Sequence, residues 1–136
     1  MLTVDRAVYD ELVAHAREGA PAEVCGVLGG THDADESHAT VARRAENAAA
    51  TPRTRYELTP TEQFALMEGI EDEGLDVVGF YHSHPAGPPR PSETDAAQAT
   101  WAGYAYVIVD LAGAEPVVGA WRWTGERFAR EAVGVA

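Results

Sequence analysis

Apolar residues near the start of the chain recur with the spacing of a helix. These positions are Val4, Val8, Leu12 and Val13. Because residues about four positions apart share one helical face, residues 5–18 are predicted to form an amphipathic helix that ends at Gly19 and Pro21. The apolar segment 23–29 follows and is predicted to be a buried strand.

The rest of the pattern predicts further strands and two more helices. The polar stretch 31–38 lacks periodicity and is expected to be an exposed hairpin loop before the chain resumes a strand pattern at 40–42. Thr59 and Pro60 favour a helix that runs to about Glu73. The other expected elements are strands at 56–58, 76–84, 104–110, 116–123 and 127–131 and a helix at 93–101. This order favours an α/β (α+β) fold with a mixed sheet flanked by helices.

Length and composition predict one domain in a reducing compartment. With 136 residues, the chain is long enough for one core and is expected to be a single domain, 1–136, without a targeting segment. No apolar run approaches the ~18 residues that span a bilayer, so no membrane partner is expected. The single cysteine, Cys25, cannot form an internal disulfide. We therefore expect a cytoplasmic protein, and sequence does not indicate its oligomeric state.

The charge of the chain is strongly acidic. There are 22 acidic and 10 basic residues, a net charge of −12, and every basic residue is arginine. Such a surface stays hydrated in molar salt, where the Debye length falls to about 3 Å, which predicts a halophilic protein. The alternative is a basic partner together with a genome that favours arginine over lysine. Nucleic acid is not an expected partner, because no basic stripe is present.

Two histidines, a serine and an aspartate lie close together between positions 82 and 95. Alternate side chains of a strand share one face, so His82 and His84 are expected to point together. Ser92 and Asp95 would lie in the first turn of the next helix, and the proline-rich stretch 85–91 limits how far they can move away. Two imidazoles and one carboxylate are a common set of catalytic zinc ligands. We expect one zinc ion per chain, bound by His82, His84 and Asp95.

Glu23 is the candidate general base, a carboxylate that opens the predicted strand 23–29. Taken singly, each feature has an ordinary explanation. Ser92 and Asp95 resemble a helix N-cap, and the two histidines alone could be ordinary strand residues. Cys25 is expected to be a buried inert thiol, although a redox influence on the site is an alternative, and His15 is expected on a helix surface. The combination favours the catalytic zinc site.

These residues resemble the signature of the JAMM (MPN+) metalloprotease family. The family motif is an upstream Glu followed by H-x-H-P-x6-S-x-x-D, and Glu23, His82, His84, Pro85, Ser92 and Asp95 match it without departure. The resemblance implies a cytidine-deaminase-like α-β-α sandwich. It also implies a zinc isopeptidase in which Glu23 transfers protons and the Ser92 hydroxyl stabilises the oxyanion.

The resemblance further implies a substrate, the bond between the C-terminal glycine of a ubiquitin-like protein and a lysine or α-amine. In a halophilic archaeal setting the modifier would be a small archaeal modifier protein (SAMP), which predicts a desampylase. An extended tail would suit an exposed strand edge, for which 54–59 is the candidate. The alternatives are release of an amino acid from a sulfur-carrier protein tail and a non-catalytic scaffold module. A zinc nucleoside deaminase is disfavoured because the chain lacks P-C-x-x-C.

Overall fold

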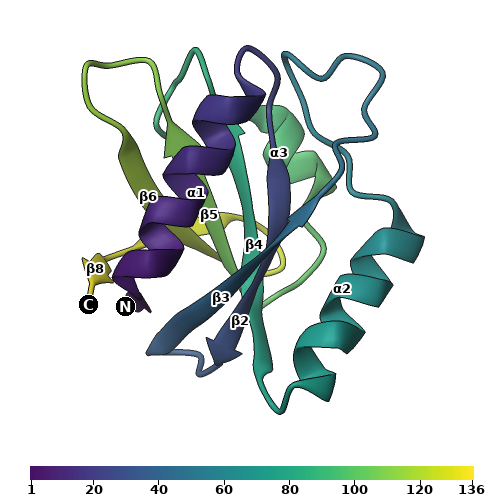
Figure 1. The fold of residues 1–136 in the computed structure, drawn as a ribbon, viewed down its shortest axis with the longest axis vertical. Coiled ribbons are helices and arrows are strands. Elements are labelled where there is room, and N and C mark those ends of the chain that lie inside the picture. The colour runs from purple at the N-terminus through teal and green to yellow at the C-terminus, as the bar shows by residue number, and fades with distance from the viewer.

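The computed structural model describes residues 1–136, which form one twisted sheet and three helices (Figure 1). The elements are β1 (Leu2–Val4), α1 (Arg6–Gly19), β2 (Cys25–Thr31), β3 (Ser37–Ala45), α2 (Pro60–Asp72), β4 (Asp76–His84), α3 (Glu93–Gln98), β5 (Ala105–Asp110), β6 (Val117–Trp123), β7 (Phe128–Glu131) and β8 (Val133–Val135). The strand order is β7-β6-β5-β4-β2-β3-β1-β8. Strand β1 pairs in parallel with β3 and β8, and β4 pairs in parallel with β5, so the sheet is mixed as predicted.

The helices cover both faces of the sheet. Helix α1 buries Val8, Leu12 and Val13, three of the four apolar positions singled out in the sequence, against a core that includes Leu28 and Tyr81. Burying side chains of this size contributes about 1.5–3 kcal/mol each, which explains why the helical pattern predicted this element. A second cluster, on the opposite face, packs α2 and α3 against β4 and β5. The fold therefore has helices on either side of a central sheet.

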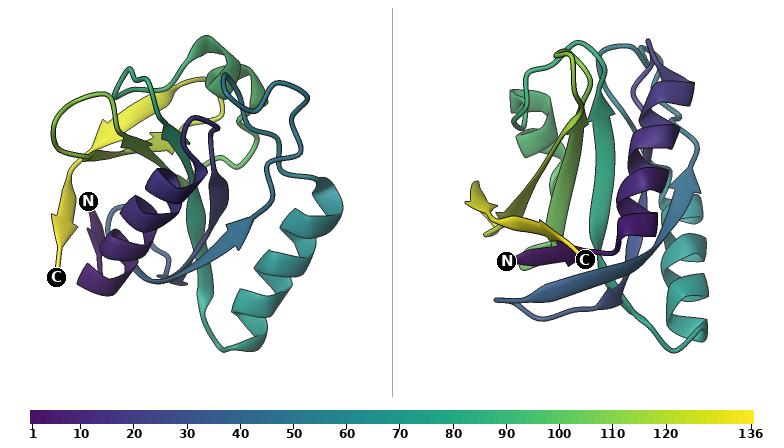
Figure 2. Two further views of the ribbon diagram at one scale, coloured as in Figure 1. Left: turned by 45° about the horizontal axis from the view of Figure 1, so that its top comes forward. Right: turned by 60° about the vertical axis from the view of Figure 1, so that its left-hand side comes forward.

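One end of the sheet gathers the segments that matter for function. Strand β4 is buried from Val77 to His84 and carries the histidine pair to its C-terminal end. At that same end lie α3 and the loop of residues 46–59 between β3 and α2, at the upper right of Figure 1. The first and last strands, β1 and β8, pair side by side at one edge of the sheet, so the two termini lie close together (Figure 2).

Several predicted boundaries are wrong. Strands β1 and β8 were not expected, because three-residue strands are too short to show a period, and β3 begins within the predicted loop 31–38. Residues 56–58 form no strand, because Glu57 pairs its backbone with Ala48 and the Asn47 side chain. The predicted strand edge at 54–59 is therefore absent.

Helix α3 ends at Gln98 and does not reach residue 101. The backbone N–H groups of Thr100 and Trp101 donate to the Tyr106 hydroxyl, at 3.4 and 3.1 Å, and this contact turns the chain away from the helix. The prediction that His15 lies on the helix surface is also wrong, since His15 is 9% exposed and its Nδ1 lies 2.7 Å from the Tyr81 hydroxyl. A hydrogen-bond partner on β4 makes burial of this polar ring possible. None of the helices is both long and apolar enough to span a bilayer.

Candidate metal centre

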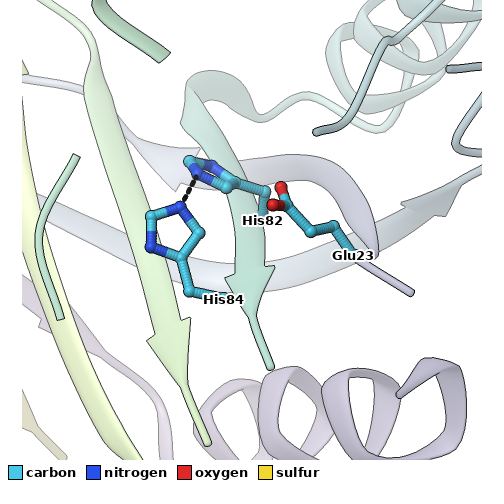
Figure 3. Close-up of side chains that lie close together, drawn as sticks. All are labelled: Glu23, His82 and His84. Carbon is cyan, nitrogen blue, oxygen red and sulfur yellow. Dashed lines mark hydrogen bonds between the residues drawn. The ribbon is translucent and has the colours of Figure 1, made fainter. Parts of the chain in front are cut away.

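The histidine pair occupies the end of β4. His82 and His84 lie on the same face of the strand, are 2% and 4% exposed, and bring their Nε2 atoms to 3.1 Å from each other. Figure 3 shows this contact as a dashed line between the two rings. The period of two in a strand therefore led to the correct placement of both imidazoles.

Asp95 comes from the first turn of α3 and completes a triangle with the histidines. Its Oδ2 atom lies 3.1 Å from Nε2 of His82 and 3.1 Å from Nε2 of His84. Ser92 caps the same helix: its Oγ accepts from the backbone N–H of Asp95 (3.0 Å), and its own N–H donates to Asp95 Oδ2 (2.9 Å). The N-cap interpretation is thus confirmed, and the cap aims the Asp95 carboxylate at the two imidazoles, as the ligand interpretation requires.

The spacing of these three atoms fits a small tetrahedral cation. Ligand atoms about 2.0–2.1 Å from a zinc ion lie about 3.3–3.4 Å from one another. The three donor atoms are mutually 3.1 Å apart, within a few tenths of an ångström of that spacing. Because His82 Nε2, His84 Nε2 and Asp95 Oδ2 converge on one point, the residues fit a metal ion with two nitrogen ligands and one oxygen ligand.

Glu23 lies beside the triangle. Its carboxylate is within 4.8 Å of a nitrogen on each imidazole, and Figure 3 shows it next to His82. Glu23 is 7% exposed, and its Oε1 atom has no hydrogen-bond partner. Asp95, which is closer to both rings, suits the third ligand position better than Glu23 does. Glu23 keeps an unpartnered oxygen that is free to accept a proton.

Electrostatics differ between the two carboxyl groups. Burial, opposed by His84 and reinforced by Asp95, raises the pKa of Glu23 to about 7. Burial also acts to raise the pKa of Asp95, but hydrogen bonds from His82 and His84 outweigh it and hold that pKa well below its usual range. One carboxyl is therefore suited to exchange protons near neutrality, and the other stays ionised.

The backbone ties Glu23 to the strand that bears the histidines. Glu23 precedes β2 and does not open it, which corrects the predicted strand start at residue 23. The next residue, Val24, donates its N–H to the Ser83 Oγ at 2.9 Å, and the Ser83 N–H donates to the Val24 oxygen at 3.0 Å. Ser83 lies between the two histidines in sequence, so this pair of bonds fixes the residue that follows Glu23 to the strand that carries the histidines.

Two orienting contacts were not found from the sequence. The His84 ring is held by a hydrogen bond of 2.8 Å between its Nδ1 and the Pro88 oxygen. The His82 ring instead stacks on Tyr56, with ring centroids 4.3 Å apart and an interplanar angle of 23°. Tyr56 belongs to an irregular loop far away in sequence, so no local pattern indicated it. The only hint in the sequence was that Tyr56 is the aromatic residue of the segment 56–58.

Cys25 is buried at the start of β2, as expected for an inert thiol. Burial, with smaller contributions from Glu62 and Glu23, raises the pKa of its thiol to about 12. A thiol with such a pKa carries almost no thiolate at neutral pH.

A mixed sheet between helices, with His82 and His84 at a strand end and Asp95 in the first turn of the next helix, agrees with the sandwich fold and the motif that the JAMM resemblance implied. The chain belongs to the prokaryotic homologues of the JAB domain, whose family profile matches residues 5–124. The family and fold class predicted from the sequence are thereby confirmed.

Named relatives and a solved structure agree with this assignment. The chain is 48% identical to a desampylase of Haloferax volcanii over 130 residues, which covers 93% of this chain and 90% of that protein. It is 36% identical over 109 residues to a CysO-cysteine peptidase of Mycobacterium tuberculosis, covering 80% of this chain and 73% of the relative. A solution structure of a Desulfitobacterium hafniense protein matches with a TM-score of 0.90 and 30% identity, over 100% of this chain and 93% of that one. The predicted peptidase class is confirmed by these matches.

Proposed function

We propose that this protein is a zinc-dependent isopeptidase that cleaves the bond between the C-terminal glycine of a ubiquitin-like modifier and an amine. The proposal is carried by the triangle of His82, His84 and Asp95 donor atoms with the unpartnered Glu23 carboxylate beside it. A buried base next to three convergent metal-ligand atoms is suited to metal-dependent hydrolysis of a peptide-type bond.

The residues divide the work of the reaction. When bound by His82, His84 and Asp95, zinc supplies Lewis-acid polarisation of the scissile carbonyl and of a water molecule. Glu23 takes a proton from the attacking water and returns it to the departing amine, which suits its pKa of about 7. The Ser92 hydroxyl uses a lone pair for the helix cap, so its proton remains available for the developing oxyanion.

A SAMP-type modifier attached to lysine is the proposed substrate. The relative from Haloferax volcanii bears the name desampylase and aligns over nearly the whole of both chains. The acidic, lysine-free composition of this chain suits the same high-salt setting. No nucleic-acid partner is proposed, and a cytoplasmic location stays a prediction from sequence.

Cleavage of a lysine-linked modifier conjugate, with and without a chelator, tests this function. Purified protein in molar salt is expected to release the modifier, and chelation is expected to stop the reaction until zinc is restored. Glu23→Gln is expected to lower kcat by at least about 10²-fold, since a general base contributes about 10²–10⁴-fold, while zinc content stays near that of the wild type. Glu126→Gln, a change of an exposed acid in the turn between β6 and β7, is the matched control and is expected to keep full activity. Full activity of Glu23→Gln would overturn the proposal.

A second candidate is release of an amino acid from the tail of a sulfur-carrier protein. It is favoured by the 36% identity to the CysO-cysteine peptidase. Comparison of kcat/KM for the two kinds of conjugate separates the candidates, because specificity is the ratio of these constants. A higher value for the lysine-linked modifier supports the isopeptidase, and the reverse supports the second candidate.

A further inference from the structure

The side chain of Asn47 holds together the irregular loop between β3 and α2. Its amide has four hydrogen-bond partners, which are the backbone oxygens of Glu23 (2.9 Å) and Arg55 (3.0 Å) and the backbone nitrogens of Ala49 (3.0 Å) and Glu57 (3.0 Å). An amide group offers two donor hydrogens and two acceptor lone pairs, so all its capacity is used. One half-buried side chain therefore joins three separate places in the chain.

One of these places is the backbone of Glu23. Glu23 lies outside the sheet and has no ladder hydrogen bonds of its own. Its N–H donates to the Pro52 oxygen at 2.7 Å, and its carbonyl oxygen accepts from Asn47 at 2.9 Å. Both partners belong to the loop of residues 46–59. Because Oε1 of Glu23 has no partner, its direction depends on how this backbone is held.

Two of the other three bonds of Asn47 lie on either side of Tyr56. The amide contacts the carbonyl oxygen of Arg55 and the N–H of Glu57, the residues on either side of the tyrosine. The Tyr56 ring stacks on His82 at 4.3 Å. The same amide thus connects the backbone of Glu23 with the segment whose aromatic ring packs against His82.

We propose that Asn47 is a positioning residue that sets the Glu23 carboxylate relative to the histidine pair, an inference that rests on the proposed peptidase function. Proton transfer requires Glu23 within hydrogen-bond reach of its partner. A displacement of about 1 Å can lower the rate about 10²-fold, so a loosened Glu23 backbone would lower kcat while substrate binding persists.

Kinetics of two Asn47 variants test the inference, with zinc at saturating concentration and temperature well below unfolding. Asn47→Ala removes all four bonds, whereas Asn47→Asp keeps an acceptor oxygen but replaces the donor NH2 group with a carboxylate oxygen that faces two carbonyl oxygens. Both are expected to lower kcat about 10- to 100-fold, with KM within about twofold and zinc content unchanged. Thr54→Ala is the matched control, because it loses one hydrogen bond of 3.3 Å in the same loop without contact to Glu23.

A double-mutant cycle with Glu23→Gln separates positioning of the base from general support of the loop. If Asn47 acts through Glu23, adding Asn47→Ala to Glu23→Gln leaves the residual rate unchanged. A further drop by the same factor as in the wild-type background, or full kcat in both single Asn47 variants, overturns the inference. A wild-type protein that does not cleave the conjugate, or a fully active Glu23→Gln, overturns the proposed function and this inference with it.

Discussion

Replacing Tyr56 by leucine should weaken metal binding without removing a ligand. His82 is 2% exposed, and its ring faces Tyr56 in a stacked geometry, 4.3 Å between centroids at 23°. Aromatic pairs contribute about 0.5–1.5 kcal/mol beyond the area that they bury. If the stacking energy stabilises only the His82 ring orientation that binds zinc, loss of the stack should weaken zinc affinity by about twofold to thirteenfold. Loss of a group that orients a metal ligand typically lowers metal affinity 10- to 100-fold. The loss estimated for Tyr56 reaches only the lower end of that range, because no other ligand is disturbed.

Competition with a zinc-binding dye measures this effect directly. Tyr56→Phe is the matched control, because phenylalanine keeps the ring that forms the stack, and it should bind zinc within about twofold of the wild type. Thermal unfolding of the zinc-free variants shows whether the loop itself has been lost. A Tyr56→Leu protein that binds zinc as tightly as the wild type would refute the orienting role, as would equal losses in both variants.

Three further predictions concern stability. A Cβ on Gly79 would collide with the Ala105 carbonyl in the neighbouring strand, so Gly79→Ala should lower the urea unfolding free energy by more than about 2 kcal/mol. A Cβ on Gly69 in α2 would meet no atom within 4 Å, so Gly69→Ala should raise the unfolding free energy by about 0.5–1 kcal/mol. Equal effects of the two substitutions on the unfolding free energy would contradict this prediction. Burial, aided by Arg44 and opposed by Glu11 and Glu18, lowers the pKa of His15 below 6.5, so this residue destabilises the fold as pH falls through 6.5. The fall in Tm between about pH 7.5 and 5.5 should therefore be smaller in His15→Gln than in the wild type, and the same fall in both proteins would contradict this role of His15. With a net charge of −12, the protein should show a higher Tm in about 2 M KCl than in 0.1 M, and a lower Tm would count against halophilic adaptation.

The positions of the candidate metal ligands could be predicted from the sequence because they follow from local periods. His82 and His84 share a face through the two-residue repeat of a strand, and Asp95 is aimed by the first turn of a helix that Ser92 caps. Glu23 was singled out as a carboxylate at the start of an apolar segment and matched the family motif, but the predicted strand start at residue 23 was wrong. Its backbone binds the loop of residues 46–59 in place of a neighbouring strand.

Contacts between distant irregular segments could not be predicted in this way. Tyr56 reaches His82, and Asn47 reaches Glu23, from a loop without periodicity. His15 was expected on the helix surface because histidine is polar, yet the Tyr81 hydroxyl provides a partner across the core. In each case the partner is determined by the tertiary fold, which a pattern in one segment does not contain.

A crystal structure of the zinc-loaded protein, with anomalous scattering recorded at the zinc edge, would show whether His82, His84 and Asp95 bind one metal ion. We predict one peak about 2.0–2.2 Å from His82 Nε2, His84 Nε2 and Asp95 Oδ2, with Glu23 outside the coordination sphere. A peak bound by Glu23 in place of Asp95, or no peak at the end of β4, would contradict it.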